Sequence, residues 1–209
     1  IFFSFLLIIF FIPIWIILAI ASIIYDKNIQ IFYSDLRIFQ NLQLYRTIKF
    51  RTMSKNANQI INMDDESKKG NHFKNMPLNS NLFTPFGKFL ERYQLNETLQ
   101  FLLIFVGKMS FVGNRPLPIN IYDNLKKNFD NVDKIYSCPC GLTGASQVIG
   151  KRYLTAKERI FIETLYAELY YSSRKLLKID FIIIFLTLRL IFSNKYASKE
   201  YVINLLNSN

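Results

Sequence analysis

The chain has 209 residues, of which 51% are hydrophobic and 16% aromatic, and its formal net charge is +11. This length suits one domain with a hydrophobic core, and the composition excludes an intrinsically disordered chain. The positive charge favours anionic partners, which include nucleic acid, anionic lipid and phosphorylated substrates, but it does not choose among them.

The first 24 residues carry no charged side chain and are long enough for a helix that spans a bilayer. They exceed the apolar part of a signal peptide and no clear cleavage site follows, which disfavours a cleaved leader. Pro13 predicts a kink, so the helix either spans the bilayer or bends and re-enters the leaflet it came from. Basic residues follow from Lys27, which predicts a cytoplasmic domain. Because the chain begins with Ile1 and not Met, we expect that residues precede it.

Two strands and a polar segment are predicted next. Residues 29–53 alternate in hydrophobicity, which indicates two short strands around a turn at Gln40–Asn41. Residues 54–85 are polar and are expected to form a short helix and a long loop. Three adjacent acids at 64–66 could bind a metal, although such runs are more often solvated surface. A single histidine, His72, leaves little for Ser-His chemistry.

The second half is predicted to be mainly helical. A helix is expected from Phe86 to Gly107, and its apolar face comprises Leu95, Leu99, Leu102, Leu103 and Val106. Prolines indicate an extended turn at 109–118, and residues 120–134 are expected to be helical. Residues 140–152 are Gly-punctuated and predicted to be a loop.

Two further helices are expected near the end of the chain. Residues 155–172 predict a helix that begins with a capping box formed by Thr155 and Glu158. The apolar run at 179–192 is short for a membrane span and favours an interfacial or buried core helix. Cys138 and Cys140 are too few ligands for a structural zinc site and are expected to be free thiols in a reducing compartment.

Several short motifs follow one another along the chain. They are KFRTM at 49–53, FGKFL at 86–90, LNE at 95–97 with Gln100 after it, MSFVGNRPL at 109–117, GLTGASQV at 141–148 and DFIIIFLT at 180–187. Together with the Pro-interrupted apolar segment, this series resembles the bacterial sugar transferases, the monotopic polyprenyl-phosphate phosphoglycosyl transferases. The resemblance covers roughly residues 8–192.

The resemblance implies a single mixed α/β, mainly helical domain on the cytoplasmic face of the inner membrane, with a Pro-kinked membrane helix and interfacial helices. It implies a membrane helix at 1–24, a transferase domain at 25–192 and a C-terminal tail at 193–209. The implied reaction moves a sugar phosphate from a UDP-sugar to polyprenyl phosphate and releases UMP, as the first membrane step of polysaccharide or glycoconjugate synthesis. The implied partners are these two substrates, the membrane, and possible further copies or other glycan-assembly enzymes.

The resemblance also implies which residues act. In the family an Asp attacks the sugar-bearing phosphate and the adjacent Glu helps to hold Mg²⁺, and these positions are Asn96 and Glu97 here. The candidate phosphate- or substrate-binding residues lie in or beside the motifs: Arg51, Arg92, Arg115, Gln147 and Lys151. Arginine binds phosphate in a bidentate manner and Mg²⁺ neutralises diphosphate charge. Arg51 could instead pair with a surface acid, and Arg115 could serve the turn alone.

The chain departs from the family pattern at seven positions. Asn96 replaces Asp, Leu99 replaces Pro, Lys108 replaces Asp, Asn114 replaces Pro, Cys140 replaces Pro, Ala145 replaces an aromatic residue and Lys151 replaces Arg. Asn96 matters most, because an amide oxygen is a poor nucleophile.

Four interpretations remain open. The chain is an active transferase with a changed mechanism or slow deamidation at position 96, or a degenerate pseudo-enzyme with a binding or partner role. A basic module for nucleic acid or anionic lipid is disfavoured, because no nucleic-acid motif is visible and the basic residues are spread along the chain. Finally, Asn96 could have been introduced to trap substrate.

Overall fold

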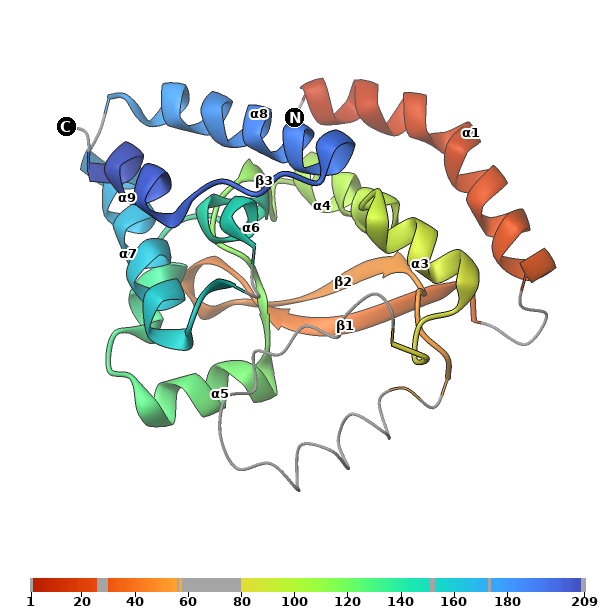
Figure 1. The fold of residues 1–209 in the computed structure, drawn as a ribbon, viewed down its shortest axis with the longest axis horizontal. Coiled ribbons are helices and arrows are strands. Elements are labelled where there is room, and N and C mark those ends of the chain that lie inside the picture. Colours follow the sequence, from red (N-terminus) through yellow and green to blue (C-terminus); the bar gives the residue numbers. More distant parts are fainter. Residues whose placement is uncertain are drawn as a thin grey trace. The chain divides into compact units, whose positions relative to one another are not determined.

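A computed structural model describes residues 2–25, 30–55, 57, 80–150, 153–172 and 174–207 (Figure 1). The fold is mixed α/β and mainly helical, with one long apolar helix at the N-terminal end, which confirms the predicted fold class. The chain forms two compact units. The first comprises Ile1–Asp35 and Thr47–Val106, and the second comprises Leu36–Arg46 and Gly107–Asn209.

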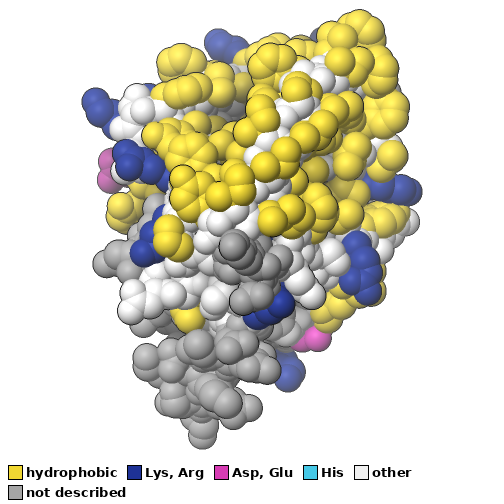
Figure 2. All heavy atoms as spheres, turned by 90° about the vertical axis from the view of Figure 1, so that its right-hand side faces the viewer, with side chains coloured by type: hydrophobic (Ala, Val, Ile, Leu, Met, Phe, Trp, Pro, Cys, Tyr) yellow, Lys and Arg dark blue, Asp and Glu magenta, His cyan; other side chains and the backbone are white. Residues whose placement is uncertain are grey.

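The long apolar helix of the first unit is α1, Phe2–Tyr25. Within the described residues it is the one helix that is long and apolar enough to cross a membrane. Large hydrophobic side chains such as Phe10 and Ile17 are exposed along it, and Figure 2 shows hydrophobic side chains over the face of the molecule where α1 lies. Pro13 lies inside the helix. The apolar helix is thus confirmed, whereas the kink and the re-entrant geometry stay predictions.

The predicted pair of strands is present. Strand β1, Phe32–Ile38, and strand β2, Leu44–Phe50, are joined by the short 3-10 helix η1, Gln40–Leu42. Asn41 has a positive φ of 56°, a conformation that asparagine tolerates better than most residues. The turn at Gln40–Asn41 is therefore confirmed. The polar segment that holds the acids at 64–66 and His72 lies outside the described residues.

The predicted helix from Phe86 to Gly107 is wrong as a single element. It is divided into α3, Pro85–Arg92, the 3-10 helix η2, Leu95–Gln100, and α4, Phe101–Phe105. A 3-10 helix has about 3.0 residues per turn, so side chains with α-helical spacing do not stay on one face. Leu99 is accordingly buried, but Leu102 and Val106 are 42% and 59% exposed.

The core of the first unit joins α1 to the motif-bearing elements. Its buried members are Leu18 of α1, Phe50 of β2, Leu90 of α3 and Leu99 of η2. Burying a large aliphatic or aromatic side chain stabilises the fold by roughly 1.5–3 kcal/mol. The same apolar contacts that stabilise this unit therefore fix α3 and η2 against the apolar helix.

The second unit contains short strands followed by helices. The elements are β3, Ser110–Val112, β4, Leu117–Pro118, α5, Ile119–Asn128, the 3-10 helix η3, Val132–Tyr136, β5, Gly141–Thr143, α6, Ala145–Ile149, α7, Ala156–Ser172, α8, Leu176–Ser193, and α9, Lys199–Asn207. Strand β4 pairs antiparallel with β1, with Arg37 opposite Pro118. Strand β3 pairs parallel with β5, with Ser110 opposite Gly141.

The segment predicted to be a loop at 140–152 is partly regular, because it holds β5 and α6. Its glycines permit close backbone contact and do not break the structure here. A Cβ added to Gly141 would lie 2.1 Å from the backbone N of Gly113, which no side chain could tolerate. Gly-rich composition thus misled the prediction, since glycine also marks places where two strands approach closely.

The helices of the second unit agree well with their predicted ranges. Thr155 N donates to Glu158 Oε2 over 2.8 Å and Glu158 N donates to Thr155 Oγ1 over 3.2 Å, so the capping box ahead of α7 is confirmed. Ile183 of α8 and Val202 of α9 are fully buried in the core of this unit. Phe181 and Phe185 of α8 are exposed, which leaves this helix with a second, outward apolar face.

Candidate functional site

The residue at the expected nucleophile position meets a carboxylate from a neighbouring helix. Asn96 of η2 is 1% exposed, and its Nδ2 donates to Glu91 Oε1 over 3.0 Å. Glu91 lies in the last turn of α3. The same Oε1 accepts a hydrogen bond from Thr52 Oγ1, also over 3.0 Å. We refer to Glu91, Asn96 and Thr52 as the acid–amide cluster.

A single backbone reversal brings Glu91 and Asn96 together. Around a continuous α-helix these two positions would lie about 140° apart and could not face one another. Gln94, however, adopts a left-handed conformation with φ 56° and ψ 21°, which ends α3 and begins η2 in a new direction. Left-handed backbone costs a residue other than glycine roughly 1–2 kcal/mol. The first unit accepts this strain where the cluster forms.

The KFRTM and FGKFL motifs are in direct contact beside the cluster. Thr52 O accepts from Thr84 N over 3.0 Å, and Thr84 caps α3 by accepting from Gly87 N over 2.9 Å. A Cβ on Gly87 would lie 1.9 Å from Thr52 O, so only glycine fits there. The close approach of α3 to the end of β2 holds Thr52 within reach of Glu91.

The Asn96 amide has an unsatisfied acceptor. Its Oδ1 is buried and has no hydrogen-bond partner among the described residues. The opposite orientation of the amide would set Oδ1 against the Glu91 carboxylate, two acceptors in contact, so the amide orientation follows from the contact and not from the density of atoms around it. A buried acceptor without a partner costs about 1–3 kcal/mol. Such an atom in a native fold marks a place where a ligand, ion or water is accommodated.

Glu97 follows Asn96 in the same 3-10 turn and is 7% exposed. No group of three or more His, Cys, Asp or Glu side chains within the described residues forms a metal cluster. The oxygens of Glu91, Asn96 and Glu97 are nevertheless the hard donors that Mg²⁺ takes, and Mg²⁺ is usually held by one or two carboxylates together with substrate phosphates. The donor chemistry around residue 96 therefore fits that ion.

Two predicted cations belong to the first unit. Arg51 donates from Nη2 to Gln30 Oε1 over 2.9 Å, and its guanidinium lies 5.5 Å from the centre of the Tyr33 ring. Its Nε is buried without a partner among the described residues. Arg51 thus contacts an amide and a ring, and no ion pair with an acid is found for it in the described part of the chain. The Arg92 guanidinium lies 5.8 Å from the Tyr93 ring, and Arg92 is exposed.

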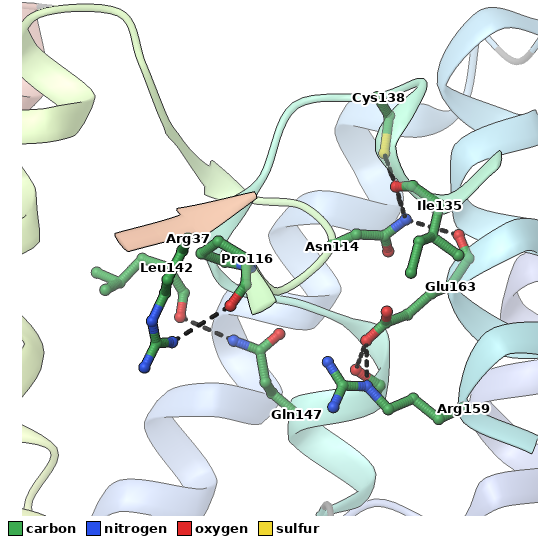
Figure 3. A network of polar contacts seen from close by, with 10 residues as sticks. Arg37, Asn114, Pro116, Ile135, Cys138, Leu142, Gln147, Arg159 and Glu163 are labelled. Atoms are coloured by element: carbon green, nitrogen blue, oxygen red, sulfur yellow. Dashed lines mark hydrogen bonds and ion pairs between the residues drawn. The ribbon is translucent and has the colours of Figure 1, made fainter. Parts of the chain in front are cut away.

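The remaining predicted residues belong to the second unit. Arg115 lies in the turn between β3 and β4. Gln147 of α6 donates from Nε2 to Leu142 O over 2.9 Å, while its Oε1 is buried without a partner among the described residues (Figure 3). Lys151 lies outside the described residues. The substrate contacts expected of these three residues stay predictions.

A buried polar network fixes the turn that carries Arg115. Asn114 Nδ2 donates to Glu163 O over 2.7 Å and to Ile135 O over 2.9 Å, and it lies 3.4 Å from Cys138 Sγ (Figure 3). The Asn114 side chain is 2% exposed. Three acceptors around one amide nitrogen hold the turn against η3 and α7, and a proline at this position could not make these contacts.

The charged end of that network is an ion pair inside the second unit. Glu163 Oε1 accepts from Arg159 Nε over 2.8 Å and from Ser146 Oγ over 2.6 Å. Both charged side chains are buried, at 1% and 7% exposure. The pair links α7 to α6, which begins directly after the GLTG turn.

Both cysteines are free and buried. Burial raises the pKa of the Cys138 thiol to about 12, and burial likewise raises the pKa of Cys140 well above its ordinary value. Thiolates are the reactive form, so neither side chain is a nucleophile at neutral pH.

The geometry can now be set beside known proteins. The sequence profile described as bacterial sugar transferase matches residues 1–194. The chain belongs to the bacterial sugar transferase family. The sequence series from KFRTM to DFIIIFLT is therefore a true family signature, which confirms the resemblance.

Three curated relatives of this sugar transferase show the range of similarity. An exopolysaccharide production protein of Rhizobium meliloti, ExoY, is 30% identical over 161 residues, which cover 72% of this chain and 67% of that protein. An undecaprenyl-phosphate galactose phosphotransferase of Salmonella typhimurium is 27% identical over 140 residues, 65% of this chain and 29% of that protein. A UDP-glucose:undecaprenyl-phosphate glucose-1-phosphate transferase of Xanthomonas campestris is 32% identical over 119 residues, 57% of this chain and 25% of that protein. The chain thus spans less than a third of the length of the last two.

Several departures of this sugar transferase from its family pattern have a physical explanation. Leu99 is buried in the core of the first unit. Lys108 Nζ lies 4.8 Å from the centre of the Tyr45 ring, a cation–π distance. Ala145 and Cys140 are fully buried, so their small side chains suit the interior. Two site residues escaped the sequence prediction, Glu91 and Thr52. Both stand beside recognised motifs, but only the reversal at Gln94 makes them neighbours of Asn96.

Proposed function

We propose that this sugar transferase moves a sugar phosphate from a UDP-sugar to polyprenyl phosphate and releases UMP, as the first membrane step of polysaccharide or glycoconjugate synthesis. The observation that carries this proposal is the convergence of three family motifs on one site. KFRTM provides Thr52, the helix begun by FGKFL provides Glu91, and LNE provides Asn96 and Glu97. The names of the Salmonella and Xanthomonas relatives support the choice of lipid acceptor, and that of the Xanthomonas relative supports a UDP-linked donor.

The contact between the site and α1 supports a lipid acceptor. Trp15 Nε1 donates to Thr98 Oγ1 over 3.0 Å, and the rings of Phe11 and Phe101 lie 5.2 Å apart. A helix suited to a membrane therefore lies directly against the 3-10 helix that bears Asn96. Polyprenyl phosphate cannot leave the bilayer, so a site joined to a membrane helix suits it. We place the chain at the inner membrane, with its site on the cytoplasmic face.

Two phosphorylated substrates require positive charge near the site. Arg51 and Arg92 supply it in the first unit, and the unpartnered Nε of Arg51 offers a further donor to phosphate. Bound Mg²⁺ would neutralise charge on the diphosphate. Glu97, Glu91 and the free Oδ1 of Asn96 are the side chains that would hold it.

A degenerate enzyme is the second candidate, and a specific observation favours it. Position 96 carries a buried amide in place of the family's nucleophilic acid, and its nitrogen is committed to Glu91. In that case the chain would keep the fold and the membrane helix, bind nucleotide sugar or a partner transferase, and catalyse no transfer.

One assay separates the two candidates. The protein in detergent or vesicles is incubated with Mg²⁺, polyprenyl phosphate and either UDP-glucose or UDP-galactose, and UMP release is measured. Release that depends on polyprenyl phosphate supports the transferase. No release from the natural chain, with release appearing in Asn96→Asp, establishes the degenerate form and identifies residue 96 as the cause.

A further inference from the structure

We propose that Glu91 supplies the nucleophilic carboxylate of this chain, in place of the acid that is absent at position 96. The inference rests on the proposed function, since it assigns a residue to that reaction. It starts from the finding that Glu91 and Asn96 lie within one hydrogen bond of each other although five residues separate them.

Accessibility favours Glu91 over its neighbours. Asn96 and Glu97 are buried, at 1% and 7% exposure. Glu91 is partly exposed at the end of α3. A donor substrate can therefore reach Glu91 while the side chains of residues 96 and 97 stay inside the fold.

The hydrogen bonds leave one oxygen of Glu91 available. Both donors, Thr52 Oγ1 and Asn96 Nδ2, are bonded to Oε1. Oε2 accepts no hydrogen bond from the described residues. Two fixed donors hold the carboxylate in one orientation, and a fixed orientation is what an attacking atom needs.

Charge explains why Asn96 suits this arrangement. An amide at position 96 donates to the carboxylate, whereas an aspartate there would place a second negative oxygen about 3 Å from Glu91 Oε1, and like charges disfavour one another at that range. The cluster is thus built around one negative charge, and that charge is on residue 91. Asn96 is a positioning residue for it.

The chemistry balances without an additional reagent. A lone pair of Glu91 Oε2 forms a bond to the phosphorus that bears the sugar, and the bond from that phosphorus to the UMP oxygen breaks, so UMP leaves with the electron pair. The product is an acyl phosphate on Glu91 that carries the sugar. An oxygen of polyprenyl phosphate then attacks the same phosphorus, the bond to Glu91 breaks, and the carboxylate is restored.

The test begins with the natural protein and Mg²⁺ but no polyprenyl phosphate. Incubation with UDP-glucose or UDP-galactose labelled in the sugar should leave label on the protein, and hydroxylamine should remove it. Peptide mapping by mass spectrometry should place the adduct on Glu91. Glu91→Gln should lose UMP release by about 10³-fold or more, as for other removed nucleophiles. Glu200→Gln, which removes an exposed carboxylate from α9 in the other unit, should keep the natural rate.

Two further variants protect the result from misinterpretation. Glu91→Gln must keep its melting temperature and its binding of UDP-sugar, so that its loss is one of chemistry. If it fails to fold, the adduct on the natural protein decides. Asn96→Asp should lower UMP release, because it adds a second acid to the cluster.

The outcomes separate the two proposals. An adduct on Glu97, or on an aspartate formed by deamidation at position 96, overturns the role of Glu91 but leaves the transferase intact. Unchanged UMP release by Glu91→Gln does the same. Absence of UMP release from the natural protein with both donors overturns the proposed function and the role of Glu91 with it.

Discussion

Trp15 of α1 and Thr98 of η2 are joined by a hydrogen bond of 3.0 Å from the indole Nε1 to the threonine Oγ1. The bond ties the apolar helix to the turn that carries Asn96, two residues before Thr98. Thr98 Oγ1 in turn donates to Leu95 O over 2.8 Å, so the hydroxyl connects α1 to the start of the same turn.

Replacing the hydroxyl tests this connection. Thr98→Val should destabilise the protein by about 1 kcal/mol, because the indole N–H loses its partner. Trp15 is the only tryptophan, so its emission should also shift and its quenching by a soluble agent should change. Thr98→Ser keeps the hydroxyl and serves as the control. Equal spectra for all three proteins would show that the bond does not form.

Gly87 and Gly107 form a matched pair for a steric test. Gly87→Ala should destabilise the first unit by about 3 kcal/mol or more, since its Cβ would lie 1.9 Å from Thr52 O. A Cβ on Gly107 has nothing within 4 Å, so the cost of Gly107→Ala should be limited to its positive φ of 71° and reach about 1–2 kcal/mol. Urea denaturation measures both. A milder effect at Gly87 would contradict the close contact of α3 with Thr52.

The buried ion pair of the second unit predicts strong coupling. Arg159→Met should destabilise by about 3–5 kcal/mol, because Glu163 keeps a buried charge without its partner. The double variant Arg159→Met, Glu163→Met should recover much of that loss, since it removes both charges. A thermodynamic cycle from denaturation of the four proteins measures the coupling, and additive effects would contradict it.

The thiols should be protected by the fold. Because burial raises the pKa of Cys138 to about 12, its thiolate is scarce near neutral pH. Iodoacetamide at about pH 8 should label the folded protein at least about tenfold more slowly than the protein unfolded in urea. Mass spectrometry of timed samples checks this. Rapid labelling in the folded state would show that the Cys-Pro-Cys segment opens.

Asp180 predicts a dependence of stability on pH. Burial raises the pKa of this carboxyl, although a hydrogen bond of 2.8 Å from Tyr166 opposes the shift. A raised pKa in the folded state gives stability that is complete below the unfolded value of about 3.9 and is lost as pH rises through the folded value. Asp180→Asn keeps an acceptor for Tyr166 and lacks this term. Its stability should therefore improve relative to the natural protein from about pH 4 upward, as measured by melting temperatures across that range.

The sequence predicted those elements whose pattern is local. The apolar α1, the hairpin around Gln40–Asn41 and the capping box at Thr155 all depend on neighbouring residues, and each is present. The break at Gln94 was missed because nothing in the composition of YQLNETLQ marks a glutamine as left-handed. The loop assigned at 140–152 failed because the pairing partner of β5 lies some thirty residues earlier, in β3.

The site was predicted in part for the same reason. Motif order located Asn96 and Glu97 correctly within a buried turn of the first unit. Glu91 and Thr52 could not be found from spacing, because their contacts with Asn96 and with each other depend on the reversal at Gln94 and on the contact at Gly87. Sequence motifs identify what a family shares, whereas these two residues show how this chain differs from it.

The left-handed Gln94 also restricts how the chain can vary over generations. By turning η2 back toward α3, it makes positions 91 and 96 a single unit of substitution. While residue 91 is a carboxylate, residue 96 must be a side chain that donates a hydrogen bond. A descendant that regains an acid at position 96 should therefore also have exchanged residue 91.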